Sequence, residues 1–580
     1  MKTQTLAQYC AAESLEQRLG DPFAPHNVFS FGNAVALDER EEYPEDACEI
    51  LDALKVFDYY VPAQLGGKLK CFEEFIAVLR VIARRDLTVA IAHGKTYLGA
   101  VATWVGGSAE QRRRLVQIIK GGSQVALALT ERSHGSDLLG SEVSAVRVVD
   151  GYELSGEKWL INNATRGRAL TVFAKTGESS DPRGFSLFFV EKNDRSTYTT
   201  LPKIKTHGIR GADISGINFE RLLLPEDSVI GRIGAGLEIM LKAFQLTRTV
   251  ITGLSLGAAD TALRITMDFA LTRKLYGDSL FAIPHARRLL CDALIDLLIC
   301  ECLSVACARS IHVEPEQMSV RSAIGKFFVP TTVEKILKSL SVVMGARQYL
   351  RQEHCDGVFQ KIYRDNGILS LFDGSTAVNL HAIGAQLGQL TRRLEHADEE
   401  LSHRLTRIVS LTDALPDFDT TALELHNRGR DSVLQGLKLS IEKLSSIDSK
   451  DATFELIIDR TQAILNEVER QRERVAASLK DDGFNKSPEM FEQAERYCAL
   501  EAAACCLHLW VHNREVLGEF FKRGDWLVLS LERLLVRLGR RRAILPSEHE
   551  QRVAEELQRL YDERQLFSIV PFQLPTGLTV

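Results

Sequence analysis

A chain of 580 residues is too long for one hydrophobic core, and at roughly 100 to 200 residues per domain it predicts three or four domains. Its composition, 45% hydrophobic and 26% charged, is typical of a folded globular protein and excludes a disordered or fibrous chain. The formal charge of −6, from 71 basic and 77 acidic residues, excludes an overall electrostatic footprint for nucleic acid, so no nucleic-acid partner is expected.

The start of the chain, MKTQTLAQYCAAESLEQRLG, lacks the apolar core of a secretory signal and carries too many acids for a typical transit peptide. Eleven scattered cysteines without a pair of CxxC motifs are interpreted as reduced core residues, and no metal site is expected. The most hydrophobic stretch, Leu289–Ala308, is interrupted by three acidic residues, which favours a bundle helix over a membrane span. Together these features predict a cytoplasmic protein.

Residues 1–124 are predicted to form an N-terminal α-helical domain. Their segments ACEILDALKVFDYY and FEEFIAVLRVIARRD place apolar residues three to four positions apart, and Pro62 and Gly66-Gly67 interrupt the pattern. From Gln124 onward, short β-rich runs such as VALALT, ALTVFAK and FSLFFVE are separated by turn residues. These runs predict a compact middle β-domain, a barrel or sandwich, over residues 125–230.

Long helical periods return after the β-rich region, at 236–274, 285–311, 318–344 and about 374–390. Four such helices predict a C-terminal four-helix bundle over residues 231–390. Residues 391–580 are again helical but more charged, and they predict an additional helical domain. The expected fold class is therefore mostly α with a central β-domain.

Two segments of the predicted β-domain carry polar groups in an order and at a spacing that match a known protein family. They are Ala128-Leu129-Thr130-Glu131 with Gly135-Ser136-Asp137, and GYELSGEKWLINNA at 151–164. Either one alone is an ordinary turn or hairpin, but together and in order they resemble the acyl-CoA dehydrogenase family of flavoproteins. The resemblance covers about residues 25–388 and implies FAD, whose flat ring needs packing walls and polar groups at its edge.

The resemblance also implies which residues of these two segments touch ligands. The expected FAD contacts are Leu129, Thr130, Leu160 and Asn162, and Ser136 is an expected substrate contact. Many relatives have a tryptophan and a threonine where this chain has Leu160 and Asn162, and the neighbouring Trp159 leaves a one-residue shift open. His134 is interpreted as a loop surface residue, with substrate contact as the alternative.

Two arginines mark the ends of the first long bundle helix. Thr247-Arg248 lies where the family places an arginine near the active centre, and Arg273-Lys274-Leu275-Tyr276-Gly277 closes the helix. Guanidinium groups suit carboxylate and pyrophosphate partners. By the resemblance, Arg248 supports the substrate site, while Arg273 and Tyr276 contact FAD, the arginine reaching the FAD of a neighbouring subunit. This implies a homodimer or homotetramer.

The segment LFDGST, residues 371–376, follows the third long helix and Tyr363-Arg364-Asp365. In these dehydrogenases a glutamate followed by Gly and Thr commonly stands there, and that glutamate is the catalytic base. The resemblance makes Asp373 the base, Gly374 a substrate contact and Ser375 a cofactor contact. The base removes the proton α to a thioester carbonyl while hydride leaves the β carbon, which gives a trans-2-enoyl thioester. A different reaction at the flavin and simple helix capping stay open.

The aspartate differs from the usual base in its reach. One methylene fewer shortens the side chain by roughly 1.5 Å, and misplacement by about 1 Å can cost on the order of a hundredfold in rate. Some members carry the base on the first long bundle helix instead, where this chain has Thr247. No second carboxylate therefore replaces Asp373 in this role.

Residues 391–580 are similar in length and placement to the extra helical domain of very-long-chain members of the family. A stripe beginning at Trp526, with Arg533, Arg537 and Arg540–Arg542, has three interpretations. The favoured one is core packing with solvated arginines. The others are a membrane-surface helix, which would give peripheral membrane contact, and a docking face for an acidic carrier protein.

The expected function is FAD-dependent α,β-dehydrogenation of an acyl-CoA, with electrons passing to an electron-transferring flavoprotein or to oxygen. One alternative is a dehydrogenase or oxidase that acts on an acyl group bound to a carrier protein in specialised biosynthesis. An alternative of another class is a non-catalytic flavoprotein that binds a protein or nucleic-acid partner.

Overall fold

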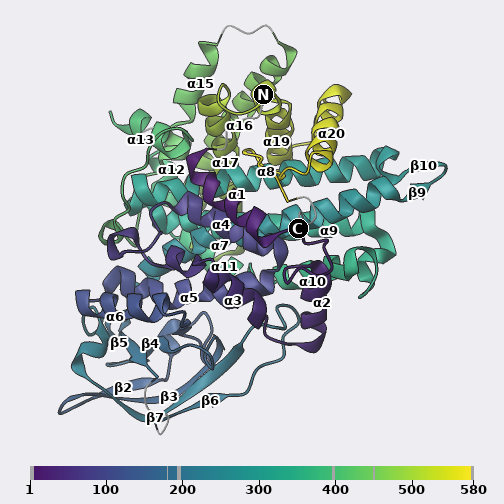
Figure 1. Cartoon of the computed structure of the whole chain (residues 1–580). Coiled ribbons are helices and arrows are strands. Elements are labelled where there is room, and N and C mark those ends of the chain that lie inside the picture. The colour runs from purple at the N-terminus through teal and green to yellow at the C-terminus, as the bar shows by residue number, and fades with distance from the viewer. Residues whose placement is uncertain are drawn as a thin grey trace.

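The computed structural model describes residues 6–178, 181–192, 197–394, 399–447, 451–481 and 483–575. Helices form both the N-terminal part and most of the long C-terminal part of the chain, and the main sheet lies in a separate region between them in sequence (Figure 1). This confirms the expected fold class, mostly α with a central β-domain. The first five residues of the N-terminal segment considered above lie outside the described range.

The N-terminal region is helical, and its central element is α5 (Leu87–Gly106). The other helices are α1 (Ala7–Leu19), α2 (Phe31–Arg40), α3 (Glu45–Ala53), α4 (Phe72–Arg85) and α6 (Ala109–Lys120). The Asp86 carboxylate accepts a hydrogen bond from the Thr88 N–H, which caps the start of α5. Almost every residue of α5 is buried, because the helix packs between strand β1 and the long helix α7.

The middle region is one mixed sheet with the strand order β6-β7-β3-β2-β4-β5-β8, and β1 runs parallel to β4. The strands are β1 (Val125–Ala128), β2 (Ser144–Val148), β3 (Gly151–Asn162), β4 (Ala169–Lys175), β5 (Phe185–Glu191), β6 (Tyr198–Leu201), β7 (Ile214–Leu224) and β8 (Val229–Ile230). Side chains from β1, β2, β3, β4, β5 and β7 meet in one apolar cluster. The sheet therefore encloses its own core.

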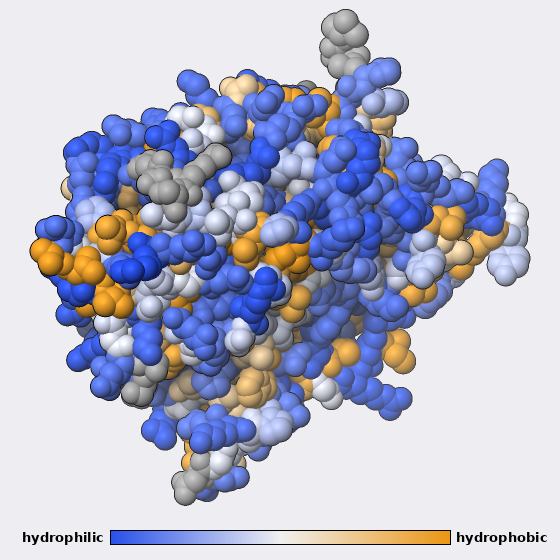
Figure 2. All heavy atoms as spheres, turned by 90° about the horizontal axis from the view of Figure 1, so that it is seen from below, coloured by the Kyte–Doolittle hydropathy of each residue, from blue (hydrophilic) through white to orange (hydrophobic). Residues whose placement is uncertain are grey.

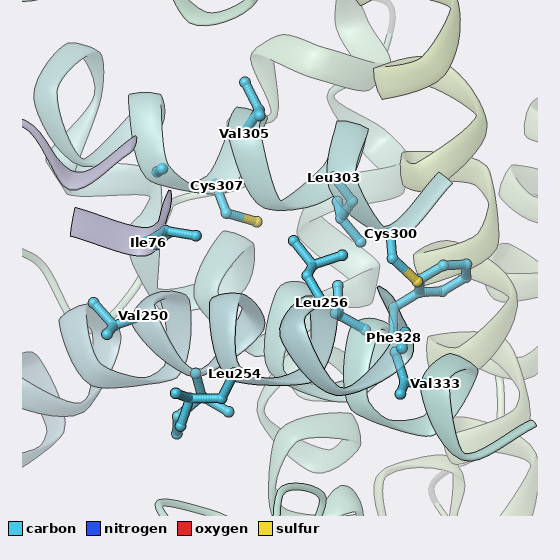
Figure 3. Close-up of a cluster of buried hydrophobic side chains, with 14 of the residues drawn as sticks. Ile76, Val250, Leu254, Leu256, Cys300, Leu303, Val305, Cys307, Phe328 and Val333 are labelled. Carbon is cyan, nitrogen blue, oxygen red and sulfur yellow. The ribbon is translucent and has the colours of Figure 1, made fainter. Parts of the chain in front are cut away.

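Three long helices form the bundle that follows: α7 (Gly236–Thr272), α8 (Pro284–Val313) and α9 (Met318–Met344). Opposite sides of α7 face different partners, since Leu256 points toward α8 and Leu254 points away from it (Figure 3). Between α7 and α8 the chain forms the short hairpin of β9 (Lys274–Leu275) and β10 (Asp278–Ser279).

The fourth bundle helix differs from its prediction. The expected helix at 374–390 is divided into α11 (Thr376–Gly384) and α12 (Leu387–Arg392), and α10 (Val358–Asn366) precedes them. Gly384 ends α11 where its Cα lies against the side chain of Met490, so that a Cβ there would meet the sulfur at 2.9 Å. Close packing against the C-terminal region therefore accompanies the break.

The C-terminal region is helical and shares one apolar core with the bundle. Its helices are α13 (Leu401–Val409), α14 (Ser432–Gln435), α15 (Leu437–Ser445), α16 (Ala452–Ser478), α17 (Pro488–Asn513), α18 (Glu519–Arg523), α19 (Asp525–Arg537) and α20 (Ser547–Asp562). Helix α17 packs along both α8 and α11, and α19 and α20 pack on α8. The additional helices are therefore attached to the bundle over a broad surface.

The apolar residues of the stripe that begins at Trp526 lie in the interior, whereas Arg541 and Arg542 at its end are exposed. Trp526 is fully buried on α19, and Arg533 forms ion pairs with Asp296 and, at 2.8 Å, with Asp292 of α8. This confirms the core interpretation of the apolar residues, although the arginine is paired rather than solvated. The face seen from below is mostly hydrophilic, with hydrophobic residues in scattered groups (Figure 2). Among the described helices, none has the length and hydropathy needed to span a bilayer.

Most of the cysteines are core residues, as the sequence predicts, but Cys10 is exposed and Cys71 and Cys355 are only partly buried. All eleven lie in the described part of the chain, where none of them forms a disulfide, and eight of them are buried. Burial raises the pKa of Cys291 and of Cys307 to about 12, so these thiols carry almost no thiolate at neutral pH. They are packing residues.

A buried histidine should make stability depend on pH. Nδ1 of His508 on α17 is 2.7 Å from the Ser440 hydroxyl, its Nε2 is 2.8 Å from the Val433 carbonyl oxygen, and burial lowers its pKa to about 3. Between about pH 6.5 and 3 the unfolded chain binds a proton there that the folded chain does not. The free energy of unfolding should therefore fall by about 1.4 kcal/mol per pH unit as the pH drops through this window.

The variant His508→Gln isolates this contribution, because glutamine keeps a donor and an acceptor but does not titrate. In urea unfolding, we expect the stability gap between wild type and variant to be about 2 kcal/mol smaller at pH 5 than at pH 7. His312, whose pKa burial also lowers, is present in both proteins and cancels. An unchanged gap would show that His508 is not the source of the pH dependence.

Candidate active site

The Asp373-Gly374 pair forms a left-handed turn between α10 and α11. Asp373 has φ 55° and Gly374 has φ 101°. The positive φ favours glycine at residue 374, and a Cβ there would lie 2.9 Å from Nη2 of Arg248, so the guanidinium would have to shift. Ser375 is the N-cap of α11, and its hydroxyl accepts from the Val378 N–H at 3.5 Å. Ser375 therefore caps the helix, and Asp373 does not.

The Asp373 carboxylate points into the protein, and its side chain is only 6% exposed. Its Oδ1 lies 3.2 Å from Nζ of Lys95 on α5, and its backbone oxygen accepts from Nε of Arg248 on α7 at 3.1 Å. Arg248 is thus placed beside Asp373, as predicted. Thr247, at the alternative base position, is buried and bonds within its own helix to the Phe244 carbonyl.

Three buried cations lie around this one carboxylate: Lys95, Arg248 and Lys326. Lys326 on α9 donates from Nζ to the Leu369 carbonyl at 2.6 Å, just before the Asp373 turn. Burial lowers the pKa of Lys326 to about 7 and that of Arg248 to about 10, and it also lowers the pKa of Lys95. The nearby Asp373 acts in the opposite direction on all three groups, since its negative charge raises their pKa values. The two lysines were missing from the sequence-based site.

A small cavity borders Asp373 between α5 and α7. Its volume is about 30 Å³, enough for about one or two water molecules. Its walls are mainly apolar, and Lys95 and Asp373 are its charged lining residues. The apolar wall includes Leu79, Ile91, Leu98, Val250, Leu254 and Phe372. The carboxylate therefore meets a small, mostly apolar space, which suits a base for a C–H proton.

The predicted flavin contacts gather at one end of strands β1 and β3. The Thr130 carbonyl, just after β1, accepts from the Trp159 N–H at 2.9 Å. The register of β3 shifts at the next residue, where Leu160 has φ 62° and is 41% exposed, although leucine is apolar. Oδ1 of Asn162 is buried and has no hydrogen-bond partner among the residues that the structure describes. An apolar surface beside an unsatisfied amide fits a flat ring with a polar edge, so these residues fit FAD.

The same end of β3 is joined to the helix that carries Lys95. Nδ2 of Asn163 donates to the Ala92 carbonyl of α5 at 3.0 Å, one turn before Lys95. The flavin-contact residues and the Asp373 cluster therefore meet α5 within about one helical turn of each other. The structure brings Asp373, Arg248 and Gly374 together. Through Asn163 it joins the end of β3, which carries Leu160 and Asn162, to the helix that carries Lys95.

Two other predicted contacts lie outside this grouping. Ser136 is exposed in the loop after Thr130, and among the described residues no hydrogen bond joins it to Asp373. In the same loop His134 lies 3.7 Å from Asp137 and 3.8 Å from Glu142, which agrees with its interpretation as a loop surface residue. The substrate role of Ser136 stays a prediction.

Arg273 and Tyr276 lie at the β9–β10 hairpin. This hairpin projects from the bundle on the side away from the β-sheet (Figure 1), and Tyr276 is 99% exposed. Within one chain these residues are therefore apart from Thr130 and Asn162. Their predicted contact with FAD needs a second subunit and stays a prediction.

A buried lysine supports the flavin side of the site. Lys158 on β3 donates from Nζ to the Leu129 carbonyl at 2.9 Å, to Glu131 at 2.7 Å and to Ser141 at 3.0 Å. Burial lowers its pKa to about 8, against the opposing effect of Glu131. Because Lys158 holds the backbone of Leu129, it fixes the segment that carries Thr130. The sequence alone does not distinguish Lys158 from an ordinary polar residue of a β-hairpin.

Replacing Lys158 with methionine should loosen flavin binding as well as the fold. The change leaves Glu131 buried without its cation, which typically costs about 3–5 kcal/mol. We expect flavin affinity to fall at least about tenfold, or about 1.4 kcal/mol, measured by equilibrium dialysis of the reconstituted protein. The double variant Lys158→Met, Glu131→Gln removes the unpaired charge and should regain stability. Wild-type affinity in the single variant would contradict the supporting role.

The comparisons with known proteins agree with this arrangement. Residues 126–222 match the family model described as acyl-CoA dehydrogenase, middle domain, and residues 234–388 match acyl-CoA dehydrogenase, C-terminal domain. A probable acyl-CoA dehydrogenase of Mycobacterium tuberculosis is 26% identical over 357 residues, which are 61% of this chain and 88% of that protein. These matches include the Asp373 turn and both flavin-side strands.

Solved structures extend the likeness in fold. Butyryl-CoA dehydrogenase from Megasphaera elsdenii has a TM-score of 0.61 at 22% identity, covering 67% of this chain and all of that one. An acyl-CoA dehydrogenase from Bacillus anthracis, solved with FAD, has a TM-score of 0.73 at 16% identity and covers 97% of this chain and 96% of that one. Because 97% of the chain is matched, the additional C-terminal helices also have a counterpart in fold. Residues 126–222 and 234–388 therefore carry the middle and C-terminal domains described for acyl-CoA dehydrogenases.

Proposed function

We propose that this protein is an FAD-dependent dehydrogenase that removes hydrogen from the α and β carbons of an acyl thioester and forms the trans-2-enoyl thioester. The observation that carries the proposal is the Asp373 carboxylate. Its side chain is only 6% exposed, it stands at the family's base position, and it borders a mostly apolar cavity between α5 and α7. A relative 26% identical over most of its own length supports the reaction class.

Asp373 would act as the base that takes the α proton. The α carbon must approach the carboxylate to about 3–3.5 Å, and the apolar walls exclude the water that would otherwise compete for the base. Arg248 and Lys326 hold the backbone of this segment through the carbonyls of Asp373 and Leu369. Their buried positive charge also favours the negative charge that develops on the thioester as the proton leaves.

The ring of FAD would be held by Leu129, Thr130, Leu160 and Asn162, the residues that provide an apolar surface and an unsatisfied amide oxygen. When bound there, FAD supplies the acceptor for the hydride of the β carbon. Electrons would then pass to an electron-transferring flavoprotein or to oxygen. The exposed β9–β10 hairpin, with Arg273 and Tyr276, would complete the site of a second subunit in a homodimer or homotetramer.

A second candidate keeps the chemistry and changes the carrier of the acyl group. The altered base suits a specialised acyl group, and a carrier protein could present it in place of CoA. A non-catalytic flavoprotein that binds a protein or nucleic acid is disfavoured, because such a protein has no use for a buried carboxylate beside an apolar cavity.

An anaerobic absorbance titration tests the proposal. The flavin-loaded protein is titrated with acyl-CoAs of increasing length and with the same acyl groups on a carrier protein. Bleaching of the flavin by one series supports the dehydrogenase and identifies the acyl carrier. Bound flavin that no thioester bleaches would contradict the reaction and favour the non-catalytic alternative.

A further inference from the structure

Three potential metal ligands meet near the C-terminal end of α7. They are Asp268 of α7, and His354 and Cys355 in the turn η9 (His354–Gly357) between α9 and α10. One carboxylate oxygen, one imidazole nitrogen and the cysteine Sγ all lie within 4.8 Å of one another. The side chains are partly shielded from water, since Asp268 is 33% and His354 19% exposed. Carboxylate, imidazole and thiolate are the ligand types that zinc takes in proteins.

The carboxylate of Asp268 is held in an orientation that suits a ligand. The Tyr561 hydroxyl of α20 donates to Oδ1 at 2.6 Å, and metal-bound carboxylates are commonly fixed by such an outer hydrogen bond. The other oxygen, Oδ2, lies 3.4 Å from Nε2 of His354. Two ligands about 2.0–2.2 Å from a tetrahedral zinc ion are about 3.3–3.6 Å apart. This oxygen and this nitrogen therefore already have the separation that a shared ion requires.

The imidazole of His354 is available for an ion. Its Nε2 also lies 3.1 Å from the Ile265 carbonyl oxygen. Ile265 is inside α7, where a carbonyl accepts from the N–H four residues further on, so this carbonyl does not need the histidine. In the tautomer that carries its proton on Nδ1, Nε2 is an acceptor beside the acceptor Oδ2 of Asp268. A cation between the two satisfies both.

A left-handed turn brings Cys355 to the same place. Cys355 has φ 52°, Asp356 has φ 57° and Gly357 has φ 75°. This conformation is unfavourable for residues other than glycine, and such strain is typical of segments that hold ligands. Burial, with the negative charges of Asp268 and Asp356, raises the pKa of the Cys355 thiol to about 12. A cation that binds there displaces the thiol proton, and the same two acids attract it.

We propose that Asp268, His354 and Cys355 bind one zinc ion, with water as the fourth ligand. Binding releases the thiol proton, so the dication, the thiolate and the carboxylate form a complex without net charge. The ion joins α7 to the segment before α10 and, through Tyr561, to α20. Because Asp268 lies about one turn before the end of α7, the ion also fixes the base of the β9–β10 hairpin. The sequence did not predict this site, because its ligands come from segments far apart in the chain.

The test is a metal titration of the full-length, flavin-loaded protein after dialysis against a chelator, under anaerobic conditions. Co²⁺ reports the ligands, because tetrahedral Co²⁺ absorbs at red wavelengths, beyond the absorption of oxidised flavin. One Co²⁺ per chain should bind with this spectrum, and one equivalent of Zn²⁺ should abolish it, since such sites prefer zinc. Cys355→Ser and His354→Gln should each weaken Zn²⁺ binding at least about a hundredfold, measured by competition with a chromophoric chelator.

Cys10→Ser is the matched control, because Cys10 is an exposed thiol on α1 and its loss should leave the cobalt spectrum unchanged. Zn²⁺ should raise the melting temperature of the wild type and not that of Cys355→Ser, because an ion that binds only the folded state stabilises it. A wild-type protein that takes up no tetrahedral Co²⁺ would overturn the inference, and this measurement requires no variant to fold. Zn²⁺ affinity that is unchanged in Cys355→Ser and His354→Gln would also overturn it. Neither outcome bears on the bleaching of the flavin, so the proposed function is tested separately.

Discussion

Replacement of Asp373 with asparagine is expected to reduce the rate of flavin bleaching by acyl thioesters on the order of 10³–10⁴-fold. Asparagine has nearly the same size and keeps an oxygen that Lys95 can bond, but its amide does not accept the α proton. Bound flavin should remain, because its expected contacts come from Leu129, Thr130, Leu160 and Asn162 on the sheet. Stopped-flow absorbance of the anaerobic protein measures the rate, and the flavin spectrum before mixing measures occupancy.

The matched variant is Asp373→Glu, which restores the missing methylene and returns roughly 1.5 Å of reach. It should keep measurable bleaching, since a carboxylate is present at the same turn. Its rate relative to wild type shows whether the pocket has adjusted to the shorter base, because a well-adjusted site loses rate when the base is displaced by about 1 Å. Wild-type bleaching in Asp373→Asn would refute the assignment of Asp373 as the base.

The fold could be predicted where long periodic segments decide the structure. The apolar period identified α7, α8 and α9 within a few residues, because these helices are buried over most of their length and their sequences show it. The prediction of one continuous fourth helix was wrong, because the apolar period continues through Gly384. The break at Gly384 is accompanied by close packing against Met490, which comes from a distant part of the chain. Contacts of that kind leave no local pattern.

The site residues likewise fall into those that local sequence motifs identify and those that only contacts between distant segments bring to the site. Asp373, Arg248 and Thr130 could be found because short motifs contain them. Lys95 could not be found in this way, because its partner Asp373 lies 278 positions away and the sequence does not distinguish a buried lysine from a solvated one. One signal was available: Lys95 stands within LTVAIAHGKTYLGAVATWVG, where it is the only residue with a full charge at neutral pH. A single charge in a helix that is otherwise apolar indicates a buried partner or a ligand.

Arg321→Met should produce the largest loss of stability. Arg321 on α9 is buried, and its guanidinium forms ion pairs with Glu314 at 3.3 Å, Asp431 at 3.1 Å and Glu501 at 3.3 Å. Removing it leaves three acids buried without a cation, and we expect the free energy of unfolding to fall by about 3–5 kcal/mol. Urea unfolding followed by circular dichroism measures the loss.

The loss should also depend on pH in a definite direction. Burial already raises the pKa of Glu314 to about 7 and that of Glu501 well above its usual value, so the folded state holds protons that the unfolded state releases above about pH 4.5. Without Arg321, the folded state should bind even more protons than the unfolded state above about pH 4.5. The deficit of the variant should therefore be larger at pH 8 than at pH 5, because protonation at low pH neutralises the unpaired acids.

Arg430→Met provides the control. The Arg430 side chain is 54% exposed, and its guanidinium is as far as 3.9 Å from the Glu316 carboxylate, so this is a surface pair of the kind that contributes about 0–1 kcal/mol.

Arg321→Met also tests how the C-terminal helices are joined to the bundle. Glu501 lies on α17 and Asp431 just before α14, so Arg321 connects both to α9. If the bundle and these helices unfold as one unit, Arg321→Met should release flavin in the same transition that melts the helices. Flavin retained after the C-terminal helices have unfolded would show that they fold apart from the bundle.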